Sequence, residues 1–531
     1  MSSTASVAFA TLVTVATVLY GGLHLILHLT QDAREPPPVP TSTPFIKPMI
    51  DLSRKKSRYY VELWEQSRMP ACTIRLPGAR LYVINETSLI PSVQRQYKTL
   101  AFPPLQAKLA MNVCGSSQTA NDILNTNVNG DEGFWGYSIT HYKAIHPPLF
   151  PGPGLDAMNR VMAQKITTSL ERIQSSEVFR LFDFVKREVT RATTDSVYGD
   201  QNPFRDPAIV EAFWEFQEGV MGLLMGLPPS FVRDSFNARE FMAKRFVQYF
   251  NEGGHEQGSA LIKARYAHSM EHKIPVEDIA RFETAGAIAI LTNTSPACFW
   301  LLYHLYSSPS ALEDCRRELG TILSENTNKT QGGGSGITIT LDLTQAKTSC
   351  PTLLSSLQEV LRLHSVGIST RQVMEDHILD GKYLLKKGGT VMIPAPVQHQ
   401  DAATWGANVH SFDHRRFFPS AKRPNPIAFR GFGGGTTLCP GRHFASTEIF
   451  AFTALMILRF DMHPVDGKWK ELTTNKASLW EVTPRPDEDL VVKLIPRDGF
   501  DLNVKWEVLV TDSDKSMPLA AEDMDALRHS E

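Results

Sequence analysis

The chain contains little cysteine, and its cysteines are scattered. Six cysteines are spread over 531 residues, and no two of them form a C-x-x-C pair. This spacing argues against a zinc site or a disulfide framework and favours a reducing compartment. Neither sign of charge is in excess, because 54 Lys and Arg oppose 56 Asp and Glu for a formal net charge of −2. This balance argues against a nucleic-acid partner.

Long apolar runs are also rare, and the longest lies near the N-terminus, from Val7 to Leu29. It is long enough to cross a bilayer. No Lys or Arg precedes it, whereas six lie between residues 34 and 58, which predicts a cytosolic body by the positive-inside rule. A cleaved signal peptide is the alternative, but it would need a charged region before the apolar run. We therefore expect an uncleaved transmembrane anchor over residues 1–30.

A proline-rich segment follows the apolar run. Pro36, Pro37 and Pro38 are consecutive, and two further prolines stand at 40 and 44. Consecutive prolines form a stiff extended spacer. We expect a hinge over residues 31–49 that holds the body at a fixed distance from the membrane.

The remaining pattern is mostly helical. Residues 155–200 and 207–250 show the periodicity of amphipathic helices, and the apolar run from Pro275 to Tyr306 predicts a buried helix. The segment from Thr73 to Ile84 alternates around a Pro-Gly pair and predicts a β-hairpin. The expected fold class is therefore mainly α with small β-sheets.

No linker composition interrupts residues 50–510, so we expect one large domain there. The polar, glycine-rich stretch from Asn326 to Gly336 predicts a surface loop, since it lacks the G-x-x-x-x-G-K-S/T pattern of a phosphate-binding loop. Residues 511–531 are polar and acidic, which predicts a disordered tail.

One cysteine, Cys439, lies in a glycine-rich loop directly before a helical pattern from His443 to Arg459. The three glycines at 433–435 allow the backbone to approach a large flat group closely. A cysteine before a helix N-terminus meets the positive end of the helix dipole, which favours the thiolate. A small buried apolar cysteine is the alternative. Together the glycines and the thiolate indicate an axial ligand for a haem iron.

Four positions of this loop, Phe432, Gly435, Cys439 and Gly441, fit the pattern F-x-x-G-x-x-x-C-x-G. The loop resembles the haem-binding signature of the cytochrome P-450 family. The resemblance implies the fold of that family, haem as the cofactor, Cys439 as the ligand of its iron, and haem contacts for the rest of the loop. The apolar run and the prolines are similar to the anchor and hinge of membrane-bound eukaryotic members.

A second set of charged residues extends the resemblance. Glu359 and Arg362 are three apart in a predicted helix, Ser355 to His364, and therefore share one face. They match the family's E-x-x-R element, and Arg416 matches an arginine that the family supplies from a later loop. The resemblance implies a buried network of these three groups that holds the cysteine loop and matters for folding. His414 stands where the family usually has proline, which affects loop stiffness.

Arg371 lies in a predicted strand, Ile368 to Val373, where the family has an arginine that pairs with a haem propionate. A guanidinium fork matches a carboxylate in shape and charge. The position two before the cysteine is usually basic in the family, but here it is Thr437, which offers only a hydroxyl. The remaining haem charge must be balanced elsewhere, and Lys143 and His141 are candidates.

Residues 289–296 read A-I-L-T-N-T-S-P. Oxygen-activating family members usually have A-G-x-D/E-T here, where the acid and the threonine hold water for proton delivery. Thr292 replaces the acid and Asn293 replaces the threonine, so the resemblance assigns the catalytic ordering of water to Asn293 and Thr294. An asparagine amide can order water and donate a hydrogen bond.

The N-T-x-P run and the C-P-G-R run resemble a subgroup of the family. That subgroup includes the cholesterol and oxysterol hydroxylases of bile-acid synthesis, the prostacyclin synthases and many enzymes of fungal secondary metabolism. By resemblance, Ile288, Ala289 and Val366 approach the substrate, together with residues 365 and 367. Residues 220–227 are apolar and methionine-rich, and they line either the roof of that pocket, the core or a membrane-contacting surface.

The resemblance implies a monooxygenase that oxidises a lipophilic small molecule, such as a terpenoid, a sterol or a polyketide-like compound of secondary metabolism. Its electrons would come from NADPH through a membrane-bound cytochrome P-450 reductase, with the chain anchored once in the endoplasmic reticulum membrane. Two alternatives stay open. One is a reductase-independent haem isomerase or dehydratase that rearranges a peroxide. The other is a non-catalytic haem protein that senses or carries a ligand.

Overall fold

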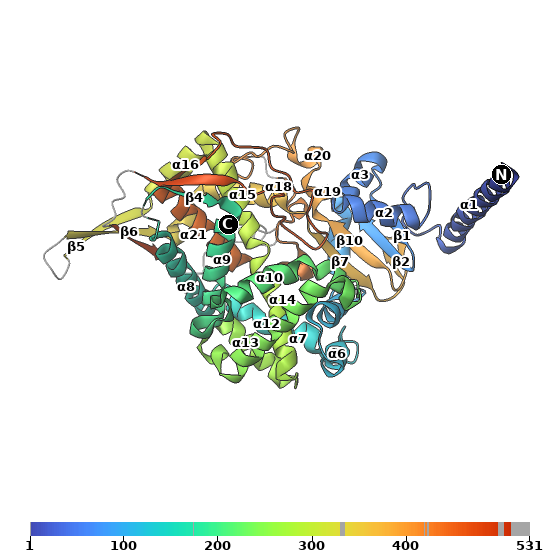
Figure 1. The fold of residues 1–531 in the computed structure, drawn as a ribbon, viewed down its shortest axis with the longest axis horizontal. Helices are drawn as coiled ribbons and strands as arrows, with labels where there is room; N and C mark the ends of the chain where they lie inside the picture. The colour runs from blue at the N-terminus through green and yellow to red at the C-terminus, as the bar shows by residue number, and fades with distance from the viewer. Residues whose placement is uncertain are drawn as a thin grey trace.

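The computed structural model describes residues 2–173, 175–329, 335–418, 420–421, 424–497 and 504–510. The body is mainly helical with short sheets, which confirms the expected fold class. Helix α1 (Ser2–Thr30) extends away from the body beside strands β1 and β2, and the paired strands β5 and β6 project at the opposite end (Figure 1). The predicted acidic tail, residues 511–531, lies outside the described residues.

Helix α1 is exposed along its length and contains a 25-residue apolar stretch with a mean hydropathy of 1.8. Four threonines reduce that hydropathy, but their hydroxyls donate to the carbonyl four residues earlier: Thr11, Thr14, Thr17 and Thr30. A hydroxyl satisfied in this way costs less in an apolar medium than a free one. The helix is therefore long and apolar enough to cross a membrane.

The proline-rich segment is not a free spacer in the structure. The Val39 amide donates to the Thr73 carbonyl at 3.0 Å, and the Thr73 amide donates to the Pro37 carbonyl at 2.8 Å. The Thr73 hydroxyl donates to the Pro36 carbonyl at 2.6 Å. Helix α2 (Ile46–Lys55) already begins inside the expected hinge. The extended proline backbone thus lies along strand β1, because proline lacks an N–H but keeps its carbonyl acceptor.

Two arginines bind the end of α1 to the sheet. Arg75 donates to the Thr30 carbonyl at 3.2 Å, and Arg80 donates to the same carbonyl at 2.8 Å. The last carbonyls of a helix lack intrahelical partners and carry the negative end of its dipole, so cations stabilise them. The anchor helix is therefore docked on the body at its C-terminal end.

The largest sheet has five strands in the order β1-β2-β10-β7-β3. Strands β1 (Ala71–Leu76) and β2 (Ala79–Ile84) form the predicted hairpin, with Ala71 opposite Ile84. Strand β10 (Thr390–Pro394) runs parallel to β2 and antiparallel to β7 (Ile368–Val373), where Val391 pairs with Arg371. The predicted strand from 368 to 373 is confirmed, and it carries Arg371 into the interior.

The apolar run from 275 to 306 forms two helices rather than one. Helix α14 (Val276–Leu291) and helix α15 (Thr294–Ser307) are separated at Thr292 and Asn293. Helix α18 (Pro351–His364) carries Glu359 and Arg362, and helix α21 (Arg442–Arg459) follows the cysteine loop with nearly all its side chains buried. Helix α15 packs against both α18 and α21, so the helix with the Glu359–Arg362 pair and the helix after the cysteine loop share one neighbour.

The expected loop from Asn326 to Gly336 is wrong at both ends. Strand β5 (Leu323–Lys329) pairs antiparallel with β6 (Ser335–Asp342), and β13 (Val504–Leu509) adds to β6 in parallel. Residues 330–334 lie outside the described residues. The alternating run from Ile337 to Leu341 is the signal for β6, and the neighbouring glycines obscured it.

The remaining elements complete the body. The helices are α3 (Arg58–Ser67), α4 (Ile90–Arg95), α5 (Pro103–Leu109), α6 (Gln118–Asn125), α7 (Tyr137–Leu149), α8 (Pro153–Leu170), α9 (Leu181–Tyr198), α10 (Pro207–Glu218), α11 (Val220–Leu224), α12 (Arg233–Asn251), α13 (Ala260–Glu271), α16 (Pro309–Gly320), α17 (Leu343–Ser349), α19 (Ala395–His399) and α20 (Ala402–Trp405). The strands are β3 (Leu100–Ala101), β4 (Glu177–Arg180), β8 (His377–Leu379), β9 (Tyr383–Leu385), β11 (Phe460–Pro464) and β12 (Val491–Pro496).

Candidate active site

The cysteine loop is a tight turn that only glycine can form. The Cys439 amide donates to the Phe432 carbonyl at 2.9 Å, which closes the loop. Gly433 and Gly435 have φ of +79° and +58°, a region that L-residues rarely adopt. A Cβ on Gly434 would lie 3.0 Å from the Gln94 side-chain nitrogen. The glycines therefore form a cradle without side chains of its own, which the Gln94 side chain approaches closely.

Cys439 differs from the other cysteines in its exposure. It is partly exposed, whereas the other five are buried. Burial still raises the pKa of its thiol, and the Gly441 N–H and the Arg442 charge oppose that rise. The N–H before the helix thus acts in the expected direction, but burial raises the pKa of the free thiol overall. A bound cation is what would make this sulfur a thiolate.

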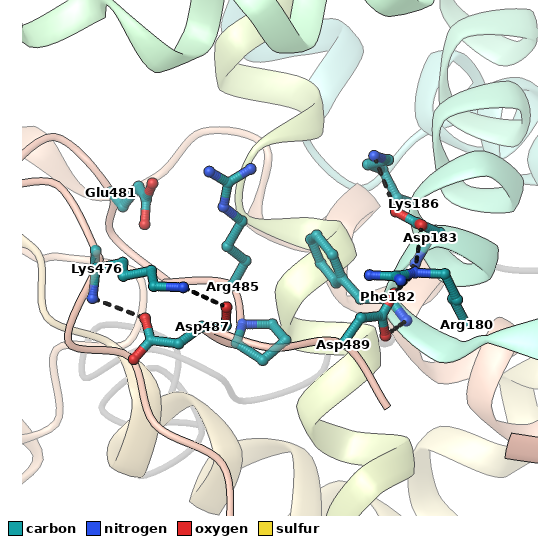
Figure 2. Close-up of a pocket in the computed structure, with 11 residues that line it drawn as sticks. Arg180, Phe182, Asp183, Lys186, Lys476, Glu481, Arg485, Asp487 and Asp489 are labelled. Atoms are coloured by element: carbon teal, nitrogen blue, oxygen red, sulfur yellow. Dashed lines mark hydrogen bonds and ion pairs between the residues drawn. The ribbon is translucent and has the colours of Figure 1, made fainter. Parts of the chain in front are cut away.

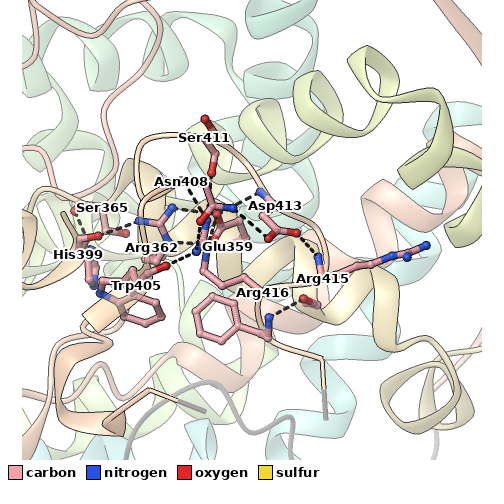
Figure 3. Close-up of polar contacts among 12 residues, drawn as sticks. Glu359, Arg362, Ser365, His399, Trp405, Asn408, Ser411, Asp413, Arg415 and Arg416 are labelled. Atoms are coloured by element: carbon pink, nitrogen blue, oxygen red, sulfur yellow. Dashed lines mark hydrogen bonds and ion pairs between the residues drawn. The ribbon is translucent and has the colours of Figure 1, made fainter. Parts of the chain in front are cut away.

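The charged residues predicted to form a network lie together in the structure (Figure 3). Arg362 donates twice to the Glu359 carboxylate, each time at 2.8 Å. Arg416 donates to the same two oxygens at 2.9 and 3.0 Å. The Glu359 and Arg362 side chains are fully buried. The single Glu359 carboxylate is the shared partner of both guanidinium groups, so its removal would leave two cations in the interior without this anion.

His399 connects this network to the cysteine loop, and it was missed in the sequence. Arg362 donates to the His399 carbonyl at 2.8 Å, and the ring Nε2 accepts from the Arg430 amide at 2.8 Å. Burial lowers the pKa of His399 to about 3, so the ring is neutral and can accept. Arg430 lies two residues before Phe432, at the start of the loop. The hydrogen bonds thus run from Glu359 through Arg362 and His399 into the loop.

Arg371 is buried on strand β7 without an anionic partner. It donates to the Thr370 carbonyl at 2.8 Å and to the Thr437 hydroxyl at 2.9 Å. Its Nε has no hydrogen-bond partner, and no carboxylate within the described ranges forms an ion pair with it. Burial and the neighbouring Arg430 lower its pKa to about 10. A buried guanidinium without a carboxylate is costly, so this position fits a bound group that brings its own carboxylates.

Lys143 and His141, the other candidates for balancing haem charge, both lie on α7. Burial lowers the pKa of His141 to about 3, so it is neutral and carries no charge to offer. Its ring stacks on Tyr137, with centroids 5.7 Å apart. The Lys143 ammonium lies over the Trp135 ring at 5.2 Å. His141 is therefore excluded as a cation at neutral pH.

Asn293 stands at the break between α14 and α15. Its side-chain oxygen accepts from the Thr483 amide at 3.2 Å. Thr294 is buried as the first residue of α15, and the Thr292 hydroxyl donates back to the Ile288 carbonyl at 2.8 Å. The amide of Asn293 is therefore oriented, with its NH2 left as the donor.

The three predicted pocket residues differ in exposure. Ile288 is buried, Ala289 is exposed, and Val366 is partly exposed. The Val366 amide donates to the Val482 carbonyl at 2.7 Å. The segment of Val482 and Thr483 thus links Val366 to Asn293, a contact that the sequence did not reveal because the partners are more than a hundred residues apart.

The predicted roof, residues 220–227, is divided between core and surface. Val220 and Leu223 on α11 are buried, whereas Met225 and Leu227 are 64% and 40% exposed. The core interpretation therefore holds for Val220 and Leu223, whereas a pocket roof and a membrane-contacting surface stay predictions.

A cavity of about 290 Å³ lies elsewhere, against the start of α9 (Figure 2). Its lining is charged, and two of its aspartates accept from backbone amides. Asp489 accepts from the amides of Phe182 and Asp183 at 2.7 and 3.0 Å, and Asp487 accepts from the amides of Asn475 and Lys476. These contacts cap a helix and close a loop, and they do not form an apolar substrate pocket.

Within the described residues, no three His, Cys, Asp or Glu side chains converge on a metal ion. An iron at Cys439 would therefore take its other ligands from a prosthetic group. The glycine cradle, the partly exposed sulfur and the unpaired Arg371 together fit a flat group that carries carboxylates, as haem does.

Comparisons with known proteins agree with this geometry. The family model described as cytochrome P-450 matches residues 240–488. A cytochrome P-450 monooxygenase, nodJ, of Hypoxylon pulicicidum is 36% identical over 92% of this chain and 95% of its own length. A 25-hydroxycholesterol 7-alpha-hydroxylase of Rattus norvegicus is 26% identical over 64% of this chain and 86% of its own.

The solved structures give the same fold. A retinoic-acid-bound cyanobacterial CYP120A1 superposes with a TM-score of 0.66 at 19% identity, over 87% of this chain and all of that one. The expected fold, with one large body behind an N-terminal apolar helix, is thereby confirmed. The chain belongs to the cytochrome P-450 family.

Proposed function

We propose that the protein is a haem-thiolate monooxygenase that inserts one oxygen atom of O2 into a lipophilic small molecule, with Cys439 as the axial ligand of the haem iron. One observation carries this proposal: a partly exposed cysteine in a glycine cradle beside a buried arginine that lacks a carboxylate. A bound haem supplies the activation of O2, and its thiolate ligand favours cleavage of the O–O bond.

The residues of the chain position this group. Arg371 binds a propionate through its unpaired Nε, and the Thr437 hydroxyl holds that guanidinium in place. The loop from Phe432 to Gly441 would hold the group through Cys439, and its glycines keep the backbone beside the cysteine free of side chains. The network of Glu359, Arg362 and Arg416 (Figure 3) fixes the loop from below.

On the substrate side, the chain supplies neutral hydrogen-bonding groups, an amide and a hydroxyl, rather than charged side chains. The Asn293 oxygen is occupied by the Thr483 amide, so its NH2 donates to water or substrate but cannot accept a proton. The Thr294 hydroxyl can both donate and accept. We assign the ordering of water to these two residues, with Ile288, Ala289 and Val366 lining an apolar pocket.

The partners follow from the family and from α1. NADPH would supply electrons through a cytochrome P-450 reductase, and α1 would anchor the chain in the endoplasmic reticulum membrane with the body in the cytosol. Relatives named as acting on cholesterol and 25-hydroxycholesterol support a sterol-like or terpenoid substrate, and a polyketide-like one fits the same apolar pocket. These compounds also partition into membranes.

A second candidate is a reductase-independent isomerase or dehydratase that rearranges a peroxide brought by the substrate. The engaged Asn293 oxygen favours it, because a site with no acid at 292 and no free acceptor at 293 has a weaker proton relay. Thr294 is the group that decides between the two, since its hydroxyl remains able to relay a proton.

The experiment compares small molecules from cells with and without this gene by untargeted mass spectrometry, and then repeats the conversion with purified protein. The proposal predicts a precursor one oxygen atom lighter than the lost product, with conversion that requires NADPH and a reductase. Cys439→Ala abolishes conversion, whereas the matched control Cys315→Ala, a buried cysteine on α16, retains it. An isomeric precursor converted without NADPH contradicts the monooxygenase and supports the second candidate.

A further inference from the structure

A second buried arginine lies beside Arg371. Arg430 is 4% exposed and Arg371 is 1% exposed. Arg430 donates to the Ser369 hydroxyl at 3.2 Å, and Ser369 and Arg371 are two apart on strand β7. Residues two apart on a strand point to the same face. The two guanidinium groups therefore lie on one face of β7.

The cysteine loop brings the two groups to the same place. An Arg430 terminal nitrogen lies 3.1 Å from the position of a Cβ on Gly434. The Thr437 hydroxyl accepts from Arg371 and also donates to the Gly434 carbonyl at 3.2 Å. Gly434 is thus flanked by Arg430 on one side and by the Thr437–Arg371 pair on the other.

Two cations buried side by side repel each other. Arg430 is one of the two causes that lower the pKa of Arg371, after burial itself. Holding both charges in the interior is favourable when a bound group contributes two negative charges. A haem carries two propionates, and the two guanidinium groups on one face of β7 could each donate to one of them.

We propose that Arg430 binds the second haem propionate, beside Arg371, and so replaces the basic residue that this chain lacks two positions before Cys439. The proposal rests on the haem site proposed above. Thr437 does not bind a propionate in this arrangement, since its hydroxyl supports Arg371 instead. Gln94, whose side-chain nitrogen lies 3.0 Å from the same Gly434 position, is close enough to add a neutral donor.

The test measures the rate at which haem leaves the purified full chain for an excess of apomyoglobin. The variants are Arg430→Gln, Arg430→Lys and the control Arg239→Gln, a change of the same kind at a 5% exposed arginine on α12. Each protein is loaded once with haem and once with haem dimethyl ester, in which both propionates are neutral. Because a hydrogen bond to a charged group contributes substantially, we expect Arg430→Gln to release haem about tenfold faster or more.

Esterification separates a contact with propionate from a general loss of stability. We expect it to speed release strongly in wild type and in Arg239→Gln, and much less in Arg430→Gln. Arg430→Lys keeps the charge and should keep most of the esterification effect, which preserves the comparison if the glutamine variant does not fold. An equal esterification effect in wild type and in every folded Arg430 variant overturns the assignment.

Failure of the proposed function looks different in this experiment. A wild-type chain that binds no haem contradicts the haem site and this inference together. A wild-type chain that binds haem, with release unchanged in Arg430→Gln, contradicts the role of Arg430 alone.

Discussion

Glu448 is a carboxyl buried without a counter-ion in helix α21. One of its oxygens accepts from the Thr193 hydroxyl at 2.6 Å, and the other has no partner. Burial raises the pKa of this carboxyl from 4.5 to about 8. The folded protein therefore keeps Glu448 protonated at neutral pH, while the unfolded chain ionises it.

This raised pKa gives a dependence of stability on pH with a definite sign. Between pH 4.5 and about 8 the folded state holds a proton that the unfolded state releases, so the free energy of unfolding falls as pH rises, by up to about 1.4 kcal/mol per pH unit. Below pH 4.5 Glu448 does not change the free energy of unfolding with pH. Above about pH 8 the stability that its proton contributes has been lost completely. We expect Glu448→Gln, which cannot ionise, to flatten the slope.

Denaturant unfolding at several pH values between 5 and 8 checks this expectation, within the usual range of such measurements. Glu488→Gln, an exposed carboxyl nearby in the sequence, is the control and should keep the wild-type slope. The account of Glu448 is wrong if Glu448→Gln and wild type lose stability with pH equally.

Spacing in the sequence was enough to find the residues that lie within one motif. Cys439, Glu359 and Arg362 each stand at a fixed distance from a neighbour of recognisable type, and the structure brings the last two together. His399 and Arg430 were missed because their contacts join segments 31 residues apart, and no local pattern marks such a pair. The effect of burial on the Cys439 thiol was not foreseen, since a helix start can be recognised in a sequence and desolvation cannot.

At the scale of elements, the break between α14 and α15 shapes the substrate side of the site. A continuous apolar run predicted one helix, but Pro296 cannot donate an amide to the carbonyl of Thr292, four residues earlier. The helix therefore opens at Thr292 and Asn293, and the Thr483 amide binds the exposed side-chain oxygen. Composition could predict the helices on either side of Asn293, whereas the position of its side chain depends on the distant segment that contains Thr483.

This contact allows the structural and catalytic roles of Asn293 to be separated. Asn293→Asp keeps an acceptor for the Thr483 amide and loses the NH2 donor, whereas Asn293→Ala loses both. We expect Asn293→Asp to unfold near the wild-type temperature and Asn293→Ala to lose about 1 kcal/mol of stability, the usual contribution of one hydrogen bond. Both should form about tenfold less product per NADPH oxidised, since a donor in a buried site has effects of at least this size.

Calorimetry measures the unfolding of the two variants, and product analysis on the same preparations measures the product formed per NADPH oxidised. Full coupling of NADPH oxidation to product in Asn293→Asp would contradict a donor role for the amide. Equal stability of Asn293→Ala and wild type would contradict the structural role of the Thr483 contact.

At the scale of the whole molecule, the sequence predicted the helical body better than the peripheral sheet and the segment at 31–49. A mainly helical body, the hairpin at 73–84 and the strand at 368–373 all followed from periodicity. The β5–β6–β13 sheet did not, because β6 and β13 pair across more than 150 residues and a glycine run at 332–336 favoured a loop. The hinge at 31–49 is docked on β1 for a similar reason: the prolines indicate an extended backbone but not what lies beside it.

The docking of α1 gives the molecule a fixed relation between anchor and body. Arg75 and Arg80 hold the last carbonyl of α1, and the proline segment adds backbone hydrogen bonds to β1. The five-stranded sheet that carries this dock also carries Arg371 on β7 (Figure 1). Helix α1 and Arg371 are therefore connected through one sheet.

The measurement that tests the account most directly is X-ray absorption at the iron edge of the purified full-length protein. We predict iron bound as haem with a sulfur neighbour in wild type, and loss of that sulfur signal in Cys439→His, whose imidazole can still bind iron. Wild-type iron without a sulfur neighbour, or a sulfur neighbour that persists in Cys439→His, would contradict the assignment of Cys439 as the haem ligand.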